Sequence, residues 1–295
     1  MILVVGASGL LGGMITQGLL AQGKKVRILT RRNPMSAHVE AGADSVSGDL
    51  KDPVSLATAV KGVTTVISTA NAAQRLGVGD LNDTFESVDL AENQNLIDAA
   101  AAAGVKQFIF TSAFTADANS PIAFVSYKGR TEQALAKSGM IYTILAPHIF
   151  MEVWFGMVIG AALQHGQPVT LIGRGDQRHS FVSMADVVSV ALASVDNPAA
   201  FNQRIAIGGA EAVSWTEVVR RVGRVVGRDL PITYVPIGAP LPIPPATWNL
   251  MYSTEMYEAI IPMDHVTDTF GLTLTSIEEV AKRLFTHVPQ PTHSN

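Results

Sequence analysis

Residues 124–128 read FVSYK, so a tyrosine stands directly before a lysine. A tyrosine four residues before a lysine would project from the same helix face, and the lysine would lower the pKa of the phenol for proton transfer. That position holds Phe124, which has no proton to give. Tyr127 lies about 100° around the helix from Lys128, so it cannot replace the missing acid without a backbone change. Lys128 is therefore the first candidate for acid–base chemistry, with Tyr127 as the alternative acid.

Two other side chains could take part in proton transfer. Ser112 follows a predicted strand and could either assist catalysis or cap a turn. His148 follows Pro147 and could bind a substrate or donate a proton, although an isolated histidine is as often structural. Lys128 also has a structural interpretation, as a solvated helix residue paired with Glu132 four positions later. If Lys128 instead acts in catalysis, Lys128→Ala should lower turnover and leave the protein folded, because a lysine at an exposed edge contributes little stability.

A glycine-rich turn stands at the beginning of the chain. Residues 4–13 read VVGASGLLGG and place Gly6, Gly9 and Gly12 three residues apart, between a predicted strand and a predicted helix. Small residues let bare backbone N–H groups approach a diphosphate, and the N-terminus of the helix adds partial positive charge. A turn that binds nothing is the alternative, but the position directly after a first strand favours a dinucleotide site.

The second predicted strand is followed by basic residues. Thr30, Arg31 and Arg32 occupy positions where a protein that prefers NAD usually has a carboxylate for the ribose hydroxyls. A guanidinium can instead pair with a 2′-phosphate through two parallel hydrogen bonds. The sequence therefore predicts NADP(H), with a solvated basic loop as the alternative. Asp49, in the stretch SGDL, could accept a hydrogen bond from the adenine amino group or cap the turn into the next helix.

The elements that must position these residues alternate along the first half of the chain. Helical patterns occur near residues 10–22, 53–60, 83–103 and 123–137, between short apolar runs. Such alternation predicts an α/β fold with a doubly wound parallel sheet, a Rossmann-type domain over residues 1–146. The expected strands are Ile2–Val5, Val26–Thr30, Ser45–Ser47, Thr65–Ser68, Gln107–Thr111 and Tyr142–Leu145.

The pattern is less regular over residues 147–295, which predict a smaller substrate lobe partly interleaved with the first domain. Its apolar run at 149–163 is short for a membrane span and contains Glu152, so a buried or pocket-lining helix is expected. Capping-box spacing marks helix starts at Ser183, Ser214 and Ser276. An apolar substrate could contact the aromatic and aliphatic side chains of the run, although a core or dimer-contact helix fits nearly as well. These side chains are Phe150, Met151, Trp154 and Phe155.

Composition narrows the class of protein. The chain has 295 residues, of which 47% are hydrophobic and 16% charged, so it can form a sizeable core. A net charge of −4 argues against nucleic acid or an anionic membrane as the main partner. There is no cysteine, and the seven histidines show no metal-ligand spacing, so no metal is expected. We expect a cytoplasmic monomer or homodimer that acts on a small molecule.

Several motifs together resemble a known family. GASGLLG, LTRR, GDL, AAAAGVKQFIFTSA, the pattern K-x-x-x-E-x-x-L-x-x-SG and YTILAPHIF occur in the order typical of atypical short-chain dehydrogenase/reductases. The chain is most similar to the NmrA-like branch, which includes Ycf39-type proteins and relatives of quinone and isoflavone reductases. RGDQRHSFVSMADVV and FNQRIAIGG extend the resemblance over nearly the whole chain. One departure is Ala146, where related sequences usually have an arginine before the proline.

The resemblance implies an NADPH-dependent reductase of a quinone, enone or aryl compound, or else a non-catalytic redox sensor or assembly factor. It implies that Lys128 orients the cofactor and assists protonation, and it places Arg178 and His179 at the edge of a substrate cleft. The implied nucleotide contacts are Gly6, Ser8, Gly9, Leu10, Leu11, Gly12, Arg31, Arg32, Asp49, Leu50, Thr69, Ala70, Thr111 and Lys128.

Overall fold

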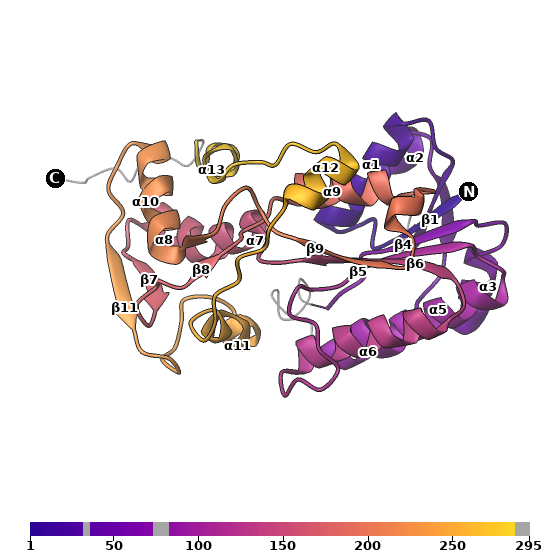
Figure 1. Ribbon diagram of the computed structural model, residues 1–295, viewed down its shortest axis with the longest axis horizontal. Coiled ribbons are helices and arrows are strands. Elements are labelled where there is room, and N and C mark those ends of the chain that lie inside the picture. The colour runs from indigo at the N-terminus through magenta and orange to yellow at the C-terminus, as the bar shows by residue number, and fades with distance from the viewer. Residues whose placement is uncertain (32–35, 73–82, 287–295) are drawn as a thin grey trace. The chain divides into compact units, whose positions relative to one another are not determined.

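The computed structural model describes residues 1–31, 36–72 and 83–286, which form two compact units (Figure 1). Unit 1 consists of Met1–Pro147 together with Val187–Ala206. Unit 2 consists of His148–Asp186 and the chain from Ile207 onward. The chain therefore leaves unit 1 after Pro147 and returns to it once.

Unit 1 is built on a seven-stranded sheet with the order β3-β2-β1-β4-β5-β6-β9. The five strand pairs among the first six strands are all parallel. The order reverses between β1 and β4, which is the point where open sheets of this kind bind ligands. The predicted doubly wound fold is thus confirmed. The strands are β1 (Ile2–Val5), β2 (Val26–Thr30), β3 (Asp44–Ser47), β4 (Thr65–Ser68), β5 (Gln107–Thr111), β6 (Ile141–Pro147) and β9 (Gln203–Ile207).

Burial explains why the central strands have nearly continuous apolar sequences. Every residue of β1, β4 and β5 is buried, as expected for parallel strands covered on both faces. At the edge of the sheet, β3 is polar and at most half-buried. A hydrophobic core cluster including Leu3, Val66, Phe108 and Leu56 fills one side of the sheet.

Helices cover both faces of this sheet. Figure 1 shows α3 (Pro53–Ala59), α5 (Asn93–Ala102) and α6 (Ala123–Lys137) on one face, and α1 (Leu10–Ala21) with α2 (Ser36–Glu40) on the other. Asp52 caps α3 by accepting a hydrogen bond from the backbone of Val54. Part of α9 (Met184–Ser194) also belongs to unit 1, followed by the short η3 (Pro198–Ala200).

The helix expected near residues 83–103 has two parts. Its first half, η1 (Phe85–Glu92), is a π-helix that begins with a capping box between Thr84 and Ser87. The second half is α5. π-Helical segments are rare and are frequently found at functional sites. This one carries Asp89 and Glu92, two buried carboxylates.

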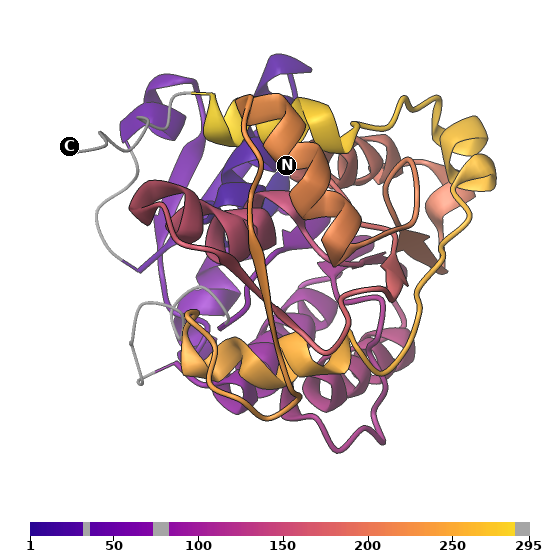
Figure 2. The same cartoon turned by 90° about the vertical axis from the view of Figure 1, so that its left-hand side faces the viewer.

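Unit 2 has its own core and two small sheets. β7 (Val169–Ile172) pairs parallel with β11 (Ile232–Val235), and β8 (Arg178–His179) pairs antiparallel with β10 (Val213–Ser214). Figure 2 shows α10 (Trp215–Val226), the orange helix near the centre of the view, which packs against α13 (Ile277–Phe285). The remaining helices are α7 (Met151–Phe155), η2 (Gly156–Gly160), α8 (Ala161–His165), η4 (Pro245–Thr247), α11 (Trp248–Ser253) and α12 (Asp264–Phe270).

The apolar run at 149–163 folds as three consecutive short helices, α7, η2 and α8, whose inward side chains lie in the core of unit 2. Within the described part of the chain, no helix is long and apolar enough to cross a membrane. Ser276 forms the full capping box with Glu279, and Ser214 caps α10. The helix start expected at Ser183 is confirmed, because α9 begins at the next residue, but the carboxylate of Asp186 accepts hydrogen bonds from Thr275.

Candidate functional site

The turn between β1 and α1 is tight in the way that a diphosphate site requires. Gly6 has a φ of +88°, a conformation that side chains disfavour. A Cβ added to Gly12 would lie 2.3 Å from the carbonyl oxygen of Gly6, and one added to Gly6 would lie 2.5 Å from Thr69 Oγ1. Gly9 occupies the N-cap of α1 without a side chain that could bind the first turn of the helix. The N–H groups of that turn are therefore suited to bind an anion.

An open pocket of about 370 Å³ surrounds this turn. It lies at the carboxyl ends of β1, β2 and β4 and is lined by eleven of the residues expected from the sequence. Arg32 lies outside the described residues, and Thr111 and Lys128 are not part of the lining. The eleven are Gly6, Ser8, Gly9, Leu10, Leu11, Gly12, Arg31, Asp49, Leu50, Thr69 and Ala70.

Acidic residues that sequence reasoning missed also line the pocket. Asp83 accepts hydrogen bonds from Arg31 Nη1 and from Lys51 Nζ, both at 2.9 Å. Lys51 Nζ also lies 3.6 Å from Glu92 Oε1, and this oxygen has no hydrogen-bond partner among the described residues. The four side chains form a charged group at one end of the pocket. Nothing in the local sequence around Asp83 or Glu92 signals this arrangement.

The pKa values within this charged group respond to burial and to charge. Burial favours the neutral form of Asp83, but hydrogen bonds from Lys51 and Arg31 outweigh it and hold the pKa of Asp83 below its usual range. The hydrogen bond to Asp83 raises the pKa of Lys51. Burial raises the pKa of Glu92, with the charge of Lys51 opposing it. Lys51 and Asp83 are therefore both charged near neutral pH.

Asp49 lines the pocket and also stabilises the turn before α3. Its Oδ1 accepts a hydrogen bond from the backbone N–H of Lys51 at 2.9 Å, and its own N–H donates to Ser55 Oγ at 3.0 Å. The turn-stabilising role considered from the sequence is thus present in the structure. The role toward adenine stays a prediction.

Lys128 is buried rather than solvated. Only 2% of the residue is exposed, and its Nζ lies 3.0 Å from Asp89 Oδ1 and donates to the carbonyl oxygen of Thr111 at 2.9 Å. Burial raises the pKa of Asp89, while the charge of Lys128 opposes that shift. The alternative that pairs a solvated Lys128 with Glu132 is wrong, because Asp89 reaches the lysine from η1.

The aromatic residue four positions before the lysine lies beside it. Lys128 Nζ is 6.0 Å from the centre of the Phe124 ring and 4.7 Å from that of Phe110. Phe124 in turn packs against Phe85 of η1, with ring centres 5.2 Å apart. Tyr127 has different surroundings, because its ring lies 5.9 Å from the guanidinium carbon of Arg130.

Ser112 belongs to a polar network that ties β5 to α6 and β9. Its hydroxyl donates a hydrogen bond to Glu132, and the other oxygen of Glu132 accepts one from Arg204 Nε at 2.9 Å. Arg204 also donates to the carbonyl oxygens of Ala113 and Phe114. The hydroxyl proton of Ser112 is thus already used in the hydrogen bond to Glu132. Close by in the sequence, Thr111 Oγ1 is buried without a hydrogen-bond partner among the described residues.

In unit 2, His148 and His179 form a chain with a backbone carbonyl. His179 Nε2 lies 2.8 Å from the oxygen of Thr254, and His148 Nε2 lies 3.1 Å from His179 Nδ1. A carbonyl only accepts, so His179 carries its proton on Nε2, and in its neutral form its Nδ1 accepts the N–H of His148. Burial, assisted by His179, lowers the pKa of His148 to about 3. His148 is therefore neutral near pH 7 and cannot serve there as an imidazolium acid.

The residues expected to contact an apolar substrate have different environments within unit 2. Met151 and Phe155 are 1% and 0% exposed, and Phe155 packs against Phe181 and Trp215 in the core. Core packing accounts for these two without a ligand. Phe150 and Trp154 are half-buried. Arg178 is exposed and forms two hydrogen bonds with Glu258, at 3.0 and 3.2 Å.

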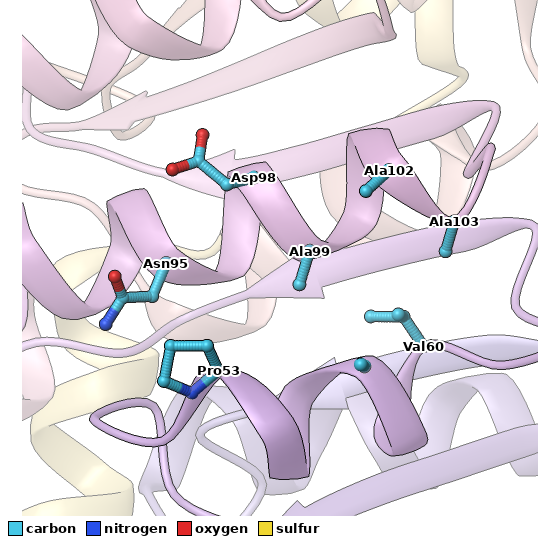
Figure 3. Close-up of a pocket in the computed structure, with 8 residues that line it drawn as sticks. Pro53, Val60, Asn95, Asp98, Ala99, Ala102 and Ala103 are labelled. Atoms are coloured by element: carbon cyan, nitrogen blue, oxygen red, sulfur yellow. The ribbon is translucent and has the colours of Figure 1, made fainter.

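A second hollow, of about 420 Å³, lies between α3 and α5, outside the nucleotide pocket. Figure 3 shows Ala99 of α5 and Ala103, the residue after it, facing Pro53 and Val60 of the α3 region. Its polar groups already have partners, because Asn95 donates to the carbonyl oxygen of Leu50 and Asp98 accepts from Gln94. We therefore assign the candidate site to the pocket at the glycine turn.

Comparison with known proteins identifies the family. The chain is 29% identical over 237 residues to the photosystem II assembly factor Ycf39 of Cyanophora paradoxa, covering 80% of this chain and 72% of that protein. It is 28% identical over 243 residues to the NAD(P)H azoreductase of Xenophilus azovorans, covering 80% and 77%.

Among solved structures, an NADPH-dependent quinone oxidoreductase of Escherichia coli, complexed with NADPH, superposes with a TM-score of 0.78 at 22% identity. This similarity covers 97% of the present chain and 100% of that chain, and it supports the fold. The model of the NmrA-like family matches residues 1–291. The chain therefore belongs to the NmrA-like family, as its motifs indicated.

Proposed function

We propose that unit 1 binds NADP(H) and that the protein is an NAD(P)H-dependent oxidoreductase acting on a small apolar electrophile, such as a quinone, an enone or an aryl compound. The observation that carries the proposal is the pocket around Gly6, Gly9 and Gly12, with Arg31 at the end of β2. Relatives with this fold include proteins named for azo-compound and quinone reduction. The names of these relatives support reduction as the reaction class, and the glycine-turn pocket supports NADP(H) as the cofactor.

The residues of the pocket fit a dinucleotide phosphate. The first turn of α1 offers backbone N–H groups to the diphosphate, and no side chain at Gly9 or Gly12 blocks its approach. Arg31 follows β2, where the ribose of a bound dinucleotide lies, and can donate to a 2′-phosphate. When bound, the nicotinamide group supplies a hydride to the acceptor.

Lys128 has a positioning role in this proposal. It is held between Asp89 and the carbonyl oxygen of Thr111, at the carboxyl end of β5. Separating Lys128 from Asp89 would leave a buried carboxylate without its cation, which is costly. Lys128 therefore fixes the end of β5. The oxyanion formed by hydride addition to a quinone is basic enough to take its proton from water.

A non-catalytic role in redox sensing or assembly is the second candidate. The observation that favours it is the combination of Phe124 and a buried Lys128, which leaves no side-chain acid at the position expected for one. The assembly factor Ycf39 is a relative of similar identity to the azoreductase. In this case the pocket of unit 1 would bind the nucleotide without turnover.

Two measurements on one set of proteins separate these candidates. The first is calorimetric titration with NADP⁺, and the second is NADPH oxidation with a panel of quinones, enones and azo dyes. Gly12→Ala serves as the binding-deficient variant because its Cβ would overlap Gly6 O. Gly156→Ala is the matched control, since its Cβ would meet nothing within 4 Å.

The proposed function requires acceptor-dependent NADPH oxidation by the wild type and by Gly156→Ala, with a loss of both activity and binding in Gly12→Ala. Binding of NADP⁺ without turnover of any acceptor would favour the sensor. Absence of binding in the wild type would contradict both candidates.

A further inference from the structure

Two described cations, Arg31 in the lining of the nucleotide pocket and Lys51 beside it, share one buried carboxylate. Asp83 accepts a hydrogen bond from Arg31 Nη1 and another from Lys51 Nζ, both at 2.9 Å. The side chain of Asp83 is 2% exposed, whereas those of Arg31 and Lys51 are 34% and 46% exposed. The carboxylate is thus the buried member of a group whose cations remain open to solvent.

Among the described residues, the charges around this group do not favour a second anion. The described side chains at this end of the pocket include two cations, Arg31 and Lys51, and three carboxylates, Asp49, Asp83 and Glu92. A phosphate monoester brings close to two further negative charges at neutral pH. Asp83 pairs with both cations, so it reduces the attraction that either can offer to a phosphate. An uncharged ribose hydroxyl does not meet this repulsion.

We propose that Asp83 is a specificity-determining residue that lowers the preference for a 2′-phosphorylated nicotinamide dinucleotide, so that the pocket accepts the phosphorylated and unphosphorylated cofactors alike. The inference rests on the proposed function, since it assumes that the pocket holds such a dinucleotide. Arg31 and Lys51 favour the phosphorylated cofactor, and Asp83 opposes them. The balance of these three residues sets the selectivity.

An opposite role for Asp83 is conceivable, in which it orients Arg31 and Lys51 and so helps them to bind the phosphate. Asparagine separates the two roles because it has the same shape and keeps one oxygen as a hydrogen-bond acceptor. Asp83→Asn therefore can retain one of the two hydrogen bonds and removes the negative charge. If repulsion dominates, the phosphorylated cofactor binds more tightly to the variant. If orientation dominates, it binds less tightly.

The test is calorimetric titration of the wild type and Asp83→Asn with NADP⁺ and with NAD⁺. Asp44→Asn is the matched control, because it removes the same charge from unit 1 at a residue that pairs with Arg27 and does not line the pocket. Thermal unfolding establishes that each variant is folded. Asp83→Ser, which is also neutral and polar, replaces Asp83→Asn if the latter does not fold.

The wild type should bind both nucleotides with similar dissociation constants. In Asp83→Asn the affinity for NADP⁺ should rise about tenfold or more, because a like charge is removed next to the phosphate, while the affinity for NAD⁺ changes by less than about threefold. The Asp44→Asn control should leave the ratio of the two affinities unchanged. An unchanged or lower ratio in Asp83→Asn, or an equal loss for both nucleotides, would overturn the inference. If the wild type binds neither nucleotide, the proposed function itself fails.

Discussion

Two of the groups in unit 1 in which a lysine or arginine meets a carboxylate differ in exposure. At the nucleotide pocket, Arg31 and Lys51 are 34% and 46% exposed while they share Asp83. In the interior, the side chains of Lys128 and Asp89 are 3% and 0% exposed. Cations open to solvent can exchange a partner for a ligand at little cost. A fully buried pair cannot, because separation leaves an uncompensated charge in a medium of low polarity.

This difference in exposure explains why Lys128, a candidate for acid–base chemistry from the sequence, has a structural role in the fold. The pair formed by Lys128 and Asp89 joins α6 to η1, and Lys128 also holds the last residue of β5. The pocket cations, in contrast, lie on loops after β2 and β3, at the edge where ligands bind in sheets of this type.

The largest expected effect concerns the buried pair. Lys128→Ala should lower the free energy of unfolding by about 3–5 kcal/mol, because Asp89 would remain buried without its cation. This corrects the expectation from the sequence that the variant folds as well as the wild type. The double variant Lys128→Met/Asp89→Asn removes both charges and should recover most of the loss. Chemical denaturation of the three proteins measures both effects, and a loss below about 1 kcal/mol in Lys128→Ala would be incompatible with a buried pair.

The next effect concerns ligand binding at the pocket cations. Arg31→Ala should weaken NADP⁺ binding by about 1.5–3 kcal/mol, since a charge-assisted hydrogen bond to the 2′-phosphate is lost. NAD⁺ binding should change little, which calorimetry with both nucleotides can establish. Arg27→Ala, which alters an arginine paired with Asp44 away from the pocket, is the control. Equal weakening for both nucleotides in Arg31→Ala would show that the arginine does not contact the phosphate.

The free energy of unfolding should also depend on pH, because unit 2 contains buried neutral histidines. The pKa of His148 is about 3 in the folded protein, so between this value and about 6.5 the unfolded chain binds a proton that the folded chain does not. Stability should therefore fall as the pH is lowered from about 6.5 toward 3, with a slope of at most about 1.4 kcal/mol per pH unit for this residue.

His148→Gln should flatten this dependence relative to the wild type, as measured by urea denaturation at a series of pH values. His165→Gln, at an exposed position on α8, is the control and should leave it unchanged. An identical pH dependence in His148→Gln and the wild type would contradict the assignment of a neutral buried imidazole.

The smallest expected effect is the change in unfolding free energy caused by replacing Lys51. Its ion pair with Asp83 is open to solvent on the lysine side, so Lys51→Ala should cost less than about 1 kcal/mol of unfolding free energy. Chemical denaturation of Lys51→Ala and Lys128→Ala then compares the two losses of unfolding free energy directly. A cost similar to that of Lys128→Ala would remove the distinction between the two groups.

Features encoded in a few neighbouring residues were predictable from the sequence. The glycine turn is one, because backbone geometry alone demands Gly6 and Gly12. The strands of unit 1 are another, since their apolar runs and the helical patterns between them leave few other arrangements. Arg31 was identified from its position directly after β2.

The partners of those residues could not be predicted, because they are distant in the sequence. Asp83 is 52 positions from Arg31, and only the fold brings them together. Lys128 has Glu132 at the spacing typical of an exposed helix pair, but its actual partner, Asp89, comes from the π-helix η1. Local sequence carries no signal for which of two carboxylates reaches a lysine.

A crystal structure of the protein grown with NADP⁺ tests the central claim most directly. We predict the diphosphate against the backbone N–H groups of Leu10 and Leu11, and the 2′-phosphate within hydrogen-bond distance of the Arg31 guanidinium. Lys128 should remain paired with Asp89 in the same structure. Density for the nucleotide outside the glycine-turn pocket, or a 2′-phosphate without contact to Arg31, would contradict the account.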